Sequence, residues 1–246
     1  MKQETLYEEC PLCNQGSVVF DNDAGVYRCS QCNLTLKERT LLGIFNKNHF
    51  GIETLGDGDF SLAEQGLKNI SLPPDRLKVV VGNVYSDQQL AQIAGGSLDV
   101  VRPVRTVLAQ IILEQLKETC YLQVTGLRRA HGQPLPEEGH YQPQQRVPRQ
   151  ELDWRDQGNL FVTSKHLVLP SDSFTFIRLD RKLTGVQAFT DGVAVQRTGE
   201  DFATYFVGSQ PHEAALVAAF VMGKLPVFHK TSEATAARQS PTNQPT

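Results

Sequence analysis

Four of the chain's five cysteines lie within its first 32 residues, in two pairs separated by a turn-rich stretch. Their spacing is C-x2-C-x15-C-x2-C, and the residues are Cys10, Cys13, Cys29 and Cys32. This spacing is typical of tetrahedral metal sites, in which each C-x2-C knuckle directs two thiolates at one ion. The pattern predicts a zinc site with four sulfur ligands. Its role is expected to be structural, because a catalytic zinc ion keeps one position open.

The residues around the cysteines support this interpretation. Asn14 and Asn33 directly follow the two knuckles, where the chain usually turns through positive φ, a conformation that asparagine tolerates. Between the knuckles, the strand-like segments SVVF and VYRC are joined by the turn residues DNDAG. Some thirty residues bury too little apolar surface to fold unaided, and a bound metal would replace the missing core.

Two local disulfides would be the alternative use of these cysteines in a secreted module. The first residues, MKQETLYEEC, lack the apolar segment of a signal peptide. We therefore expect a cytoplasmic protein with reduced cysteines. Cys120 stands apart from the other four, and we interpret it as a buried structural thiol.

Residues 8–38 as a whole resemble the zinc-ribbon family, which includes ribbons of transcription factors and RNA-polymerase subunits. The resemblance implies a bound zinc ion but leaves the function open, since ribbons contact DNA, RNA and proteins alike. Between the ligands lie only one arginine, Arg28, and two aromatic residues, Phe20 and Tyr27. An exposed basic and aromatic surface for nucleic acid is therefore not evident.

The middle of the chain, residues 41–118, is expected to be a linker followed by helices. Ser86 and Gly95 would begin and end a short helix over YSDQQLAQIAGG. A second helix is expected over RPVRTVLAQIILEQLKET, since apolar residues recur at helical spacing after Pro103. Its apolar stripe either packs on the protein's own sheet or docks a partner helix.

From residue 119 the sequence changes to short segments with alternating apolar residues, which predict antiparallel strands. The dipeptide Asp191-Gly192 favours a hairpin with a type I′ turn. After the strands, an apolar segment with Pro211 in its first turn and Gly223 at its end predicts a helix. The expected fold class is α+β, with a zinc ribbon, a helical middle and a C-terminal antiparallel barrel or sandwich capped by a helix.

The segments DQGNLFVTSKHLVL, FIRLDRKLTGVQAFTDGVAVQR and YFVG, with the closing helix, resemble the pleckstrin-homology-like fold of the GRAM or bacterial type. The resemblance covers roughly residues 119–225, and His166 stands where an arginine is common. Members of that fold bind phosphoinositides, peptides or other proteins, so the resemblance does not fix a ligand. The predicted domains are 1–40 (zinc ribbon), 41–118 (linker and helices), 119–226 (pleckstrin-homology-like) and 227–246 (disordered tail).

Lipid phosphate would require several cations in the loop between the first two strands of this domain. We expect that loop to lie within GLRRAHGQPLPEEGHYQPQQRVPR, where the candidate ligands are Arg128, Arg129 and His131. Glutamates in the same stretch oppose the interpretation. A second basic cluster, Arg178, Arg181 and Lys182, is interpreted as a solvated turn.

Composition and the absence of certain motifs restrict the classes of function that this sequence supports. A net charge of −3 gives no general attraction to nucleic acid or anionic lipid, and apolar runs such as AALVAAFVM are too short to span a membrane. No phosphate loop, G-x-S-x-G or H-E-x-x-H motif is present. We expect a non-enzymatic zinc-binding adaptor or scaffold for an unidentified protein partner. Binding of nucleic acid or the transcription apparatus through the ribbon, and of lipid headgroups through the C-terminal domain, remain open alternatives.

Overall fold

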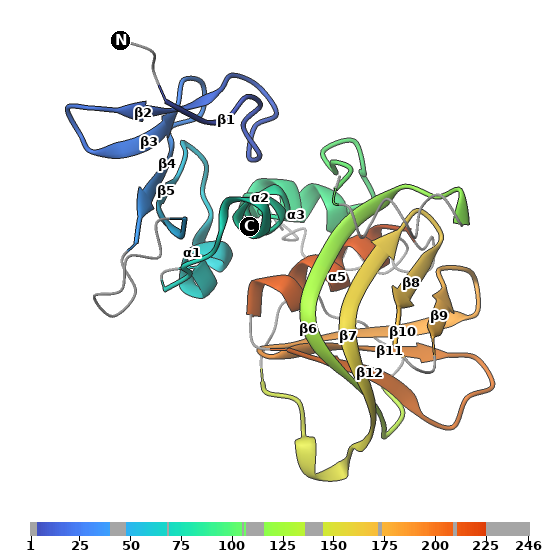
Figure 1. The fold of residues 1–246 in the computed structure, drawn as a ribbon. Helices are drawn as coiled ribbons and strands as arrows, with labels where there is room; N and C mark the ends of the chain where they lie inside the picture. The colour runs from blue at the N-terminus through green and yellow to red at the C-terminus, as the bar shows by residue number, and fades with distance from the viewer. Residues whose placement is uncertain are drawn as a thin grey trace, which may run out of the picture. The chain divides into compact units, whose positions relative to one another are not determined.

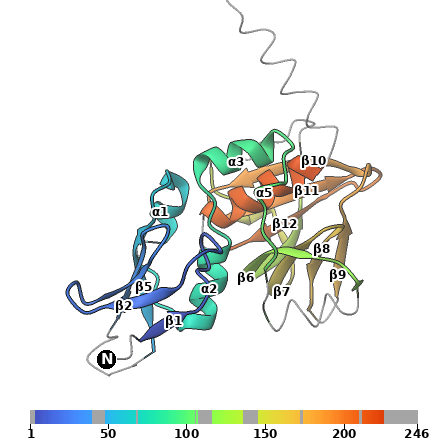
Figure 2. The ribbon, with the colours of Figure 1, turned by 90° about the horizontal axis from the view of Figure 1, so that it is seen from above.

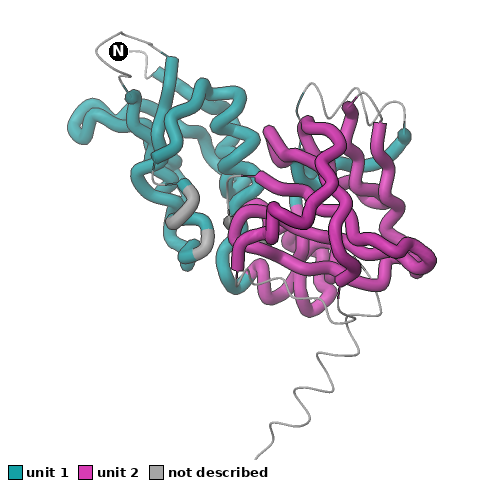
Figure 3. The backbone as a smooth tube through the Cα atoms, turned by 90° about the horizontal axis from the view of Figure 1, so that it is seen from below, with its two compact units in different colours: residues 1–88, 102–123 teal, residues 89–101, 124–246 magenta. Residues whose placement is uncertain are grey.

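The chain divides into two compact units, each built from two stretches of sequence. The computed structural model describes residues 4–39, 48–67, 69–104, 106, 116–135, 145–171, 174–208 and 211–224. Unit 1 comprises residues 1–88 and 102–123, and unit 2 comprises residues 89–101 and 124–246 (Figure 3). The fold class is mixed, with mostly antiparallel sheets and few helices.

Unit 1 contains an antiparallel sheet with the strand order β1-β2-β3-β4-β5 (Figure 1). The strands are β1 (Thr5–Tyr7), β2 (Val18–Asp21), β3 (Val26–Cys29), β4 (Leu34–Glu38) and β5 (Phe50–Leu55). The turn between β2 and β3 is the one expected from DNDAG: Asp21 Oδ1 accepts hydrogen bonds from the backbone N–H groups of Asp23 and Ala24. Strand β5 was expected to belong to a linker, but it extends the sheet of the cysteine-rich segment by pairing with β4.

Three short helices follow in the sequence: α1 (Ser61–Leu67), α2 (Pro74–Gly82) and α3 (Asp87–Ala94). Helix α3 confirms the first predicted helix, since it begins directly after Ser86 and ends directly before Gly95. The second predicted helix falls largely on residues 107–115, which lie outside the described residues.

One apolar core joins the sheet of unit 1 to its helices. It contains Leu34 and Leu36 of β4 together with Leu77 and Val81 of α2, all four with no exposed surface. The sheet and α2 therefore stabilise each other. The predicted boundary at residue 40 remains a prediction, whereas this shared core extends well beyond it.

Unit 2 is built on a seven-stranded sheet with the order β10-β11-β12-β6-β7-β8-β9. Its strands are β6 (Cys120–Gly132), β7 (Asp153–Thr163), β8 (His166–Leu169), β9 (Thr175–Arg178), β10 (Leu183–Phe189), β11 (Gly192–Arg197) and β12 (Ala203–Val207). Among the described residues, β9 and β10 are not paired with each other, so the sheet is not a closed barrel. A short 3-10 turn, Arg149–Glu151, precedes β7.

The predicted C-terminal helix is confirmed as α5 (Pro211–Lys224), which packs against β10 and β11 (Figure 2). Its side chains that face the sheet are almost fully buried: Leu216, Val217, Phe220 and Val221. Gly223 is required near its end because a Cβ atom there would lie 2.2 Å from the carbonyl oxygen of Ile93.

The β10–β11 hairpin is confirmed, but its turn differs from the predicted one. Phe189 pairs with Gly192, so the loop residues are Thr190 and Asp191, and neither has a positive φ. The turn is therefore not type I′ around Asp191-Gly192. Asp191 acts instead as an anchor: its carboxylate accepts hydrogen bonds from the N–H of Val147 and from Arg149.

Some predicted features cannot be compared with the fold. The predicted tail, 227–246, lies outside the described residues. Among the helices of the described residues, none is long and apolar enough to cross a membrane.

Candidate metal centre

The four clustered cysteines lie on two backbone knuckles of unit 1. In the first knuckle, the N–H of Asn14 donates to the carbonyl oxygen of Cys10 at 2.9 Å, and the N–H of Cys10 donates to Gly16 O at 2.9 Å. The predicted positive φ is confirmed at both knuckles, with 54° at Asn14 and 58° at Asn33. These turns direct each pair of thiols to one point.

The sulfur atoms of the four cysteines are arranged as ligands of a single ion would be. All four lie within 4.8 Å of one another, and they belong to Cys10, Cys13, Cys29 and Cys32. Cys10 Sγ lies 3.7 Å from Cys32 Sγ, and Cys13 Sγ lies 3.8 Å from Cys29 Sγ. Both distances join one knuckle to the other. A tetrahedron with metal–sulfur bonds of about 2.3 Å has edges of ~3.8 Å. A disulfide would require ~2.0 Å, so these cysteines are not disulfide-bonded.

The local surroundings give the thiols different pKa values. Burial raises the pKa of Cys10 far above its usual range, and burial also raises the pKa of Cys32, to about 11. Burial acts in the same direction on Cys29, but hydrogen bonds from the N–H groups of Gln31 and Cys32 and from the thiols of Cys10 and Cys32 together lower its pKa. Cys29 is therefore more acidic than Cys10 and Cys32. A metal ion would supply the positive charge that the other three thiolates need.

Packing around the knuckles holds them at this separation. Cys10 and Cys29 are almost fully buried. Gly56, at the end of β5, has a φ of 93° and lies so close to the second knuckle that a Cβ atom would meet the carbonyl oxygen of Cys32 at 2.3 Å. Sequence reasoning missed this support from β5, although the alternation in FGIETL could have indicated a strand.

The donor set therefore fits a metal ion with a preference for sulfur. Four protein thiolates complete a tetrahedral shell, and no ligand position is left for water or a substrate. Such a set suits zinc and also iron. The arrangement can hold the two knuckles together, while chemistry at the metal would require one cysteine to leave.

The surface between the two cysteine pairs offers few groups for nucleic acid. Tyr27 is buried at 6% exposure, and its ring packs on Phe20 and Phe50. Arg28 lies 3.9 Å from Asp21, so its charge is partly neutralised. Tyr27 therefore presents no exposed ring for stacking on bases, and the half-exposed Arg28 is shared with Asp21.

The three predicted lipid ligands lie on strand β6, which extends to Gly132, and not in a loop. Each engages another side chain of unit 2. The guanidinium of Arg128 lies 3.9 Å from the ring centroid of Trp154, and that of Arg129 forms two hydrogen bonds to Asp156. The His131 ring stacks on Phe202 at 4.0 Å. Burial and then the charges of Arg155 and Arg129 lower the pKa of His131, which disfavours its cationic form.

Cys120 is buried away from the metal cluster, as expected of a structural thiol. Its Sγ donates to the carbonyl oxygen of Leu122 at 3.2 Å, and burial raises its pKa to about 12. A thiol this weakly acidic is a poor nucleophile at neutral pH.

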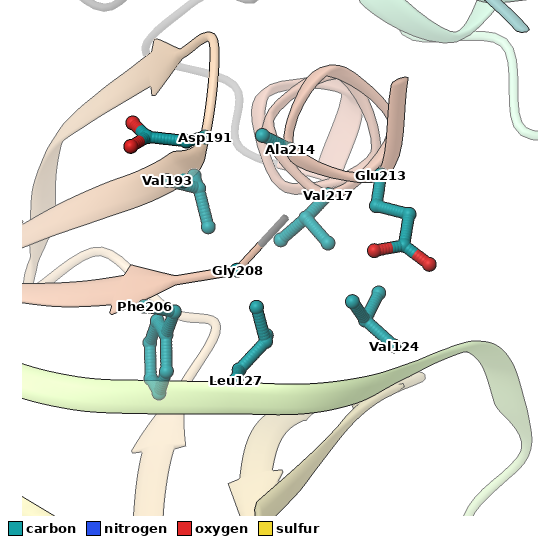
Figure 4. Close-up of a pocket in the computed structure, with 10 residues that line it drawn as sticks. Val124, Leu127, Asp191, Val193, Phe206, Gly208, Glu213, Ala214 and Val217 are labelled. Carbon is teal, nitrogen blue, oxygen red and sulfur yellow. The ribbon is translucent and has the colours of Figure 1, made fainter. Parts of the chain in front are cut away.

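Unit 2 also contains one acidic side chain in apolar surroundings. Glu213, in the first turn of α5, borders a void of about 10 Å³ with Val124, Leu127 and Val217 (Figure 4). Burial raises the pKa of Glu213 to about 7. The void is too small for a substrate, since a single water needs roughly this volume.

Comparison of the chain with protein-family models, with curated proteins and with solved structures found no match in any of the three. The site is therefore interpreted from its own geometry.

Proposed function

We propose that this chain is a non-enzymatic, zinc-binding adaptor, in which zinc folds unit 1 and unit 2 contributes to recognition of a protein partner. The observation that carries the proposal is the closed set of four sulfur atoms within 4.8 Å. A metal with all four positions filled by protein stabilises a fold and does not bind substrate. On this proposal unit 1 is a zinc ribbon extended by β5.

We further propose that unit 2 is a variant of the pleckstrin-homology-like fold. Support comes from its topology: a four-strand meander (β6 to β9), a three-strand meander (β10 to β12), pairing of β12 with β6, and a closing helix. An interaction role agrees with the way Arg128, Arg129 and His131 are engaged within the protein, because this leaves fewer free cations for a phosphate group.

The metal part of the proposal is tested by measuring the bound metal in protein purified from its native cells. We expect one zinc ion per chain by native mass spectrometry and elemental analysis. Cys29→Ser should lose the ion, whereas Cys120→Ser, the matched control, should keep it. Iron in place of zinc, or an ion retained in Cys29→Ser, would refute the assignment.

The adaptor part is tested by co-purification of the tagged full chain from the same cells. We expect a protein partner whose co-purification resists nuclease treatment. Recovery of nucleic acid, with binding that falls steeply as salt increases, would instead support the ribbon as a nucleic-acid module. Recovery of neither would contradict the adaptor function.

A further inference from the structure

Strand β9 lies at one edge of the sheet of unit 2, and among the described residues it pairs with β8 alone. The register between them pairs Val168 with Phe176 and His166 with Arg178. These four residues share one face of the hairpin, because side chains alternate along a strand. On the opposite face, the core side, Leu167, Leu169 and Ile177 are buried. Val168 is buried as well, so on the outer face the exposed apolar surface belongs to β9 and not to β8.

The outer face of this hairpin carries two exposed phenylalanines. Phe174 is 43% and Phe176 is 44% exposed, and they are the large apolar side chains most open to solvent among the described residues. Their ring centroids lie 4.8 Å apart, and the His166 ring meets Phe176 edge-on at 6.0 Å. Phe174 has a φ of 36°, which costs a bulky residue about 1 to 3 kcal/mol.

Backbone groups of β9 are also directed to the open edge. The N–H of Leu179 donates to the carbonyl oxygen of Lys165 at 2.7 Å, toward the β8 side. In an antiparallel ladder, alternate residues bond to the same neighbour, so Ile177 bonds to β8 as well. The N–H and C=O groups of the intervening residues, Phe176 and Arg178, therefore point away from β8.

Positive charge gathers at the base of the same hairpin. The exposed cations there are Lys165, Arg178, Arg181 and Lys182. Asp180 is the one acidic residue among the described residues from 165 to 182, and it lies 3.6 Å from Arg178. Arg178 nevertheless keeps 66% of its side chain exposed. The edge is thus aromatic at the end near the β8–β9 turn and cationic at the opposite end, where β9 leads into residues 179–182.

We propose that the open edge of β9 binds an extended, acidic segment of a partner protein, which adds to the sheet as a further strand. Backbone hydrogen bonds to Phe176 and Arg178 would supply affinity. The peptide would place an apolar side chain opposite Phe176 and a carboxylate opposite Arg178, two positions away on the same face. The inference rests on the proposed adaptor function and assigns it a surface and a partner chemistry.

Charge and geometry favour this occupant over the others. A second copy of the chain would bring the same group of cations to the interface, whereas an acidic peptide complements them. Single-stranded nucleic acid is typically bound where cations follow the backbone beside successive aromatic rings, but here aromatic and cationic residues occupy opposite ends. An anionic membrane would use the charges and the rings but not the backbone groups of the edge.

The test is selection of peptides from a random display library on the immobilised full chain, followed by solution affinity measurements. We expect enriched peptides to carry an apolar residue and an acidic residue two positions apart. Phe176→Ser should weaken the best peptide by more than tenfold. Lys37→Glu, a charge reversal at an exposed residue of β4, is the matched control for Arg178→Glu. It should leave the peptide affinity unchanged.

A charge reversal and a backbone modification make the test specific. Arg178→Glu should weaken binding of the acidic peptide, and replacing its carboxylate residue by lysine should restore it. N-methylation of a peptide amide that bonds to β9 should abolish binding, whereas methylation of the next amide should have little effect. Thermal unfolding of each variant checks that the sheet remains intact.

Several outcomes would overturn the proposal. One is a selection that enriches no motif, and another is peptide binding that is insensitive to N-methylation. A third is a Phe176-dependent interaction with anionic vesicles or single-stranded DNA in place of peptides. These failures are separate from failure of the adaptor function, because a partner that co-purifies equally with wild type and Phe176→Ser would keep that function and assign it to another surface.

Discussion

At the scale of single residues, the knuckles depend on a backbone conformation that few side chains accept. Asn14 and Asn33 both have positive φ, and both follow the second cysteine of their pair. Asparagine enters this conformation at lower cost than other residues with a Cβ atom, and glycine at the lowest cost. The asparagines therefore allow the two sulfur pairs to converge.

We predict that Asn14→Ala destabilises the metal-loaded protein by about 1 kcal/mol, while Asn14→Gly leaves its stability unchanged or slightly higher. Asn14 is exposed, so packing loss is small. The free energy of unfolding from urea titration would show this difference. Asn22→Ala, at an exposed asparagine without positive φ, is the control. Equal effects of alanine at the two positions would contradict the argument.

A second prediction at the scale of single residues concerns Glu213 and the pH dependence of the protein's stability. Its pKa is raised to about 7 in the folded protein, from an ordinary value of 4.5. The folded state therefore favours the protonated carboxyl, and this contribution to stability is complete below about pH 4.5 and lost as the pH rises to 7. Above that, the buried carboxylate carries a penalty of at most about 3 kcal/mol.

We expect Glu213→Gln to remove this penalty, so that the variant is more stable than wild type at pH 8 and equal or less stable at pH 4.5. Thermal unfolding across this pH range is the measurement. Glu151→Gln, at an exposed glutamate of the same unit, controls for the loss of one charge. An identical pH profile for Glu213→Gln and wild type would show that this carboxyl is solvated in the folded protein.

At the scale of elements, an ion pair joins β6 to β7. Arg129 Nε lies 2.9 Å from Asp156 Oδ1, and the two side chains are only 13% and 12% exposed. Ser171 Oγ donates to Asp156 at 2.7 Å, which satisfies the second carboxylate oxygen further. A charge that is this buried is costly to leave without its partner.

We predict that Arg129→Ala destabilises the protein by about 2 to 4 kcal/mol, because Asp156 would keep its charge without a counterion. Arg39→Ala is the matched control: Arg39 pairs with Glu53, but both are about 40% exposed (42% and 38%) and the pair should contribute under ~1 kcal/mol. Chemical denaturation would compare the two losses. Similar values would mean that water reaches the Arg129 pair.

Alternation of apolar residues was sufficient to predict most strands of unit 2, and helix caps were sufficient for α3 and α5. The C-terminal half of β6 was missed because its sequence, LRRAHG, reads as a polar loop. In the structure, Arg129 pairs with Asp156 on β7, and the His131 ring stacks on that of Phe202, which directly precedes β12. Such pairing over long sequence distances leaves no local signal.

At the scale of the whole molecule, the cluster of four cysteines was predictable from the sequence, whereas the apolar core that unit 1 shares between its sheet and its helices was not. A cysteine spacing is local, so the four candidate ligands could be read directly from the chain. The shared core of unit 1 arises from tertiary packing of Leu34 and Leu36 with Leu77 and Val81. Contacts over such long sequence distances leave no local signal, and the domain boundary at residue 40 stays a prediction.

Removal of the metal should affect the two units differently. We predict that a strong chelator at neutral pH abolishes hydrogen-exchange protection of β2, β3 and α2, since a four-thiolate site contributes roughly 10 kcal/mol to small folds. Protection in β10 to β12 should persist, because these strands have their own apolar core. Zinc added back should restore unit 1. Loss of protection in both units at once would show that they unfold as one cooperative system.

The discontinuous make-up of unit 1 has a consequence for biosynthesis. Its last residues, 102–123, emerge from the ribosome long after Cys32. At ~5–20 residues per second, roughly 5 to 20 s separate the two events. During that interval the knuckles are complete but lack part of their unit. Early capture of a metal ion would protect four nascent thiols from oxidation and from mispairing with one another while the rest of the unit is being made, and with Cys120 once that residue emerges.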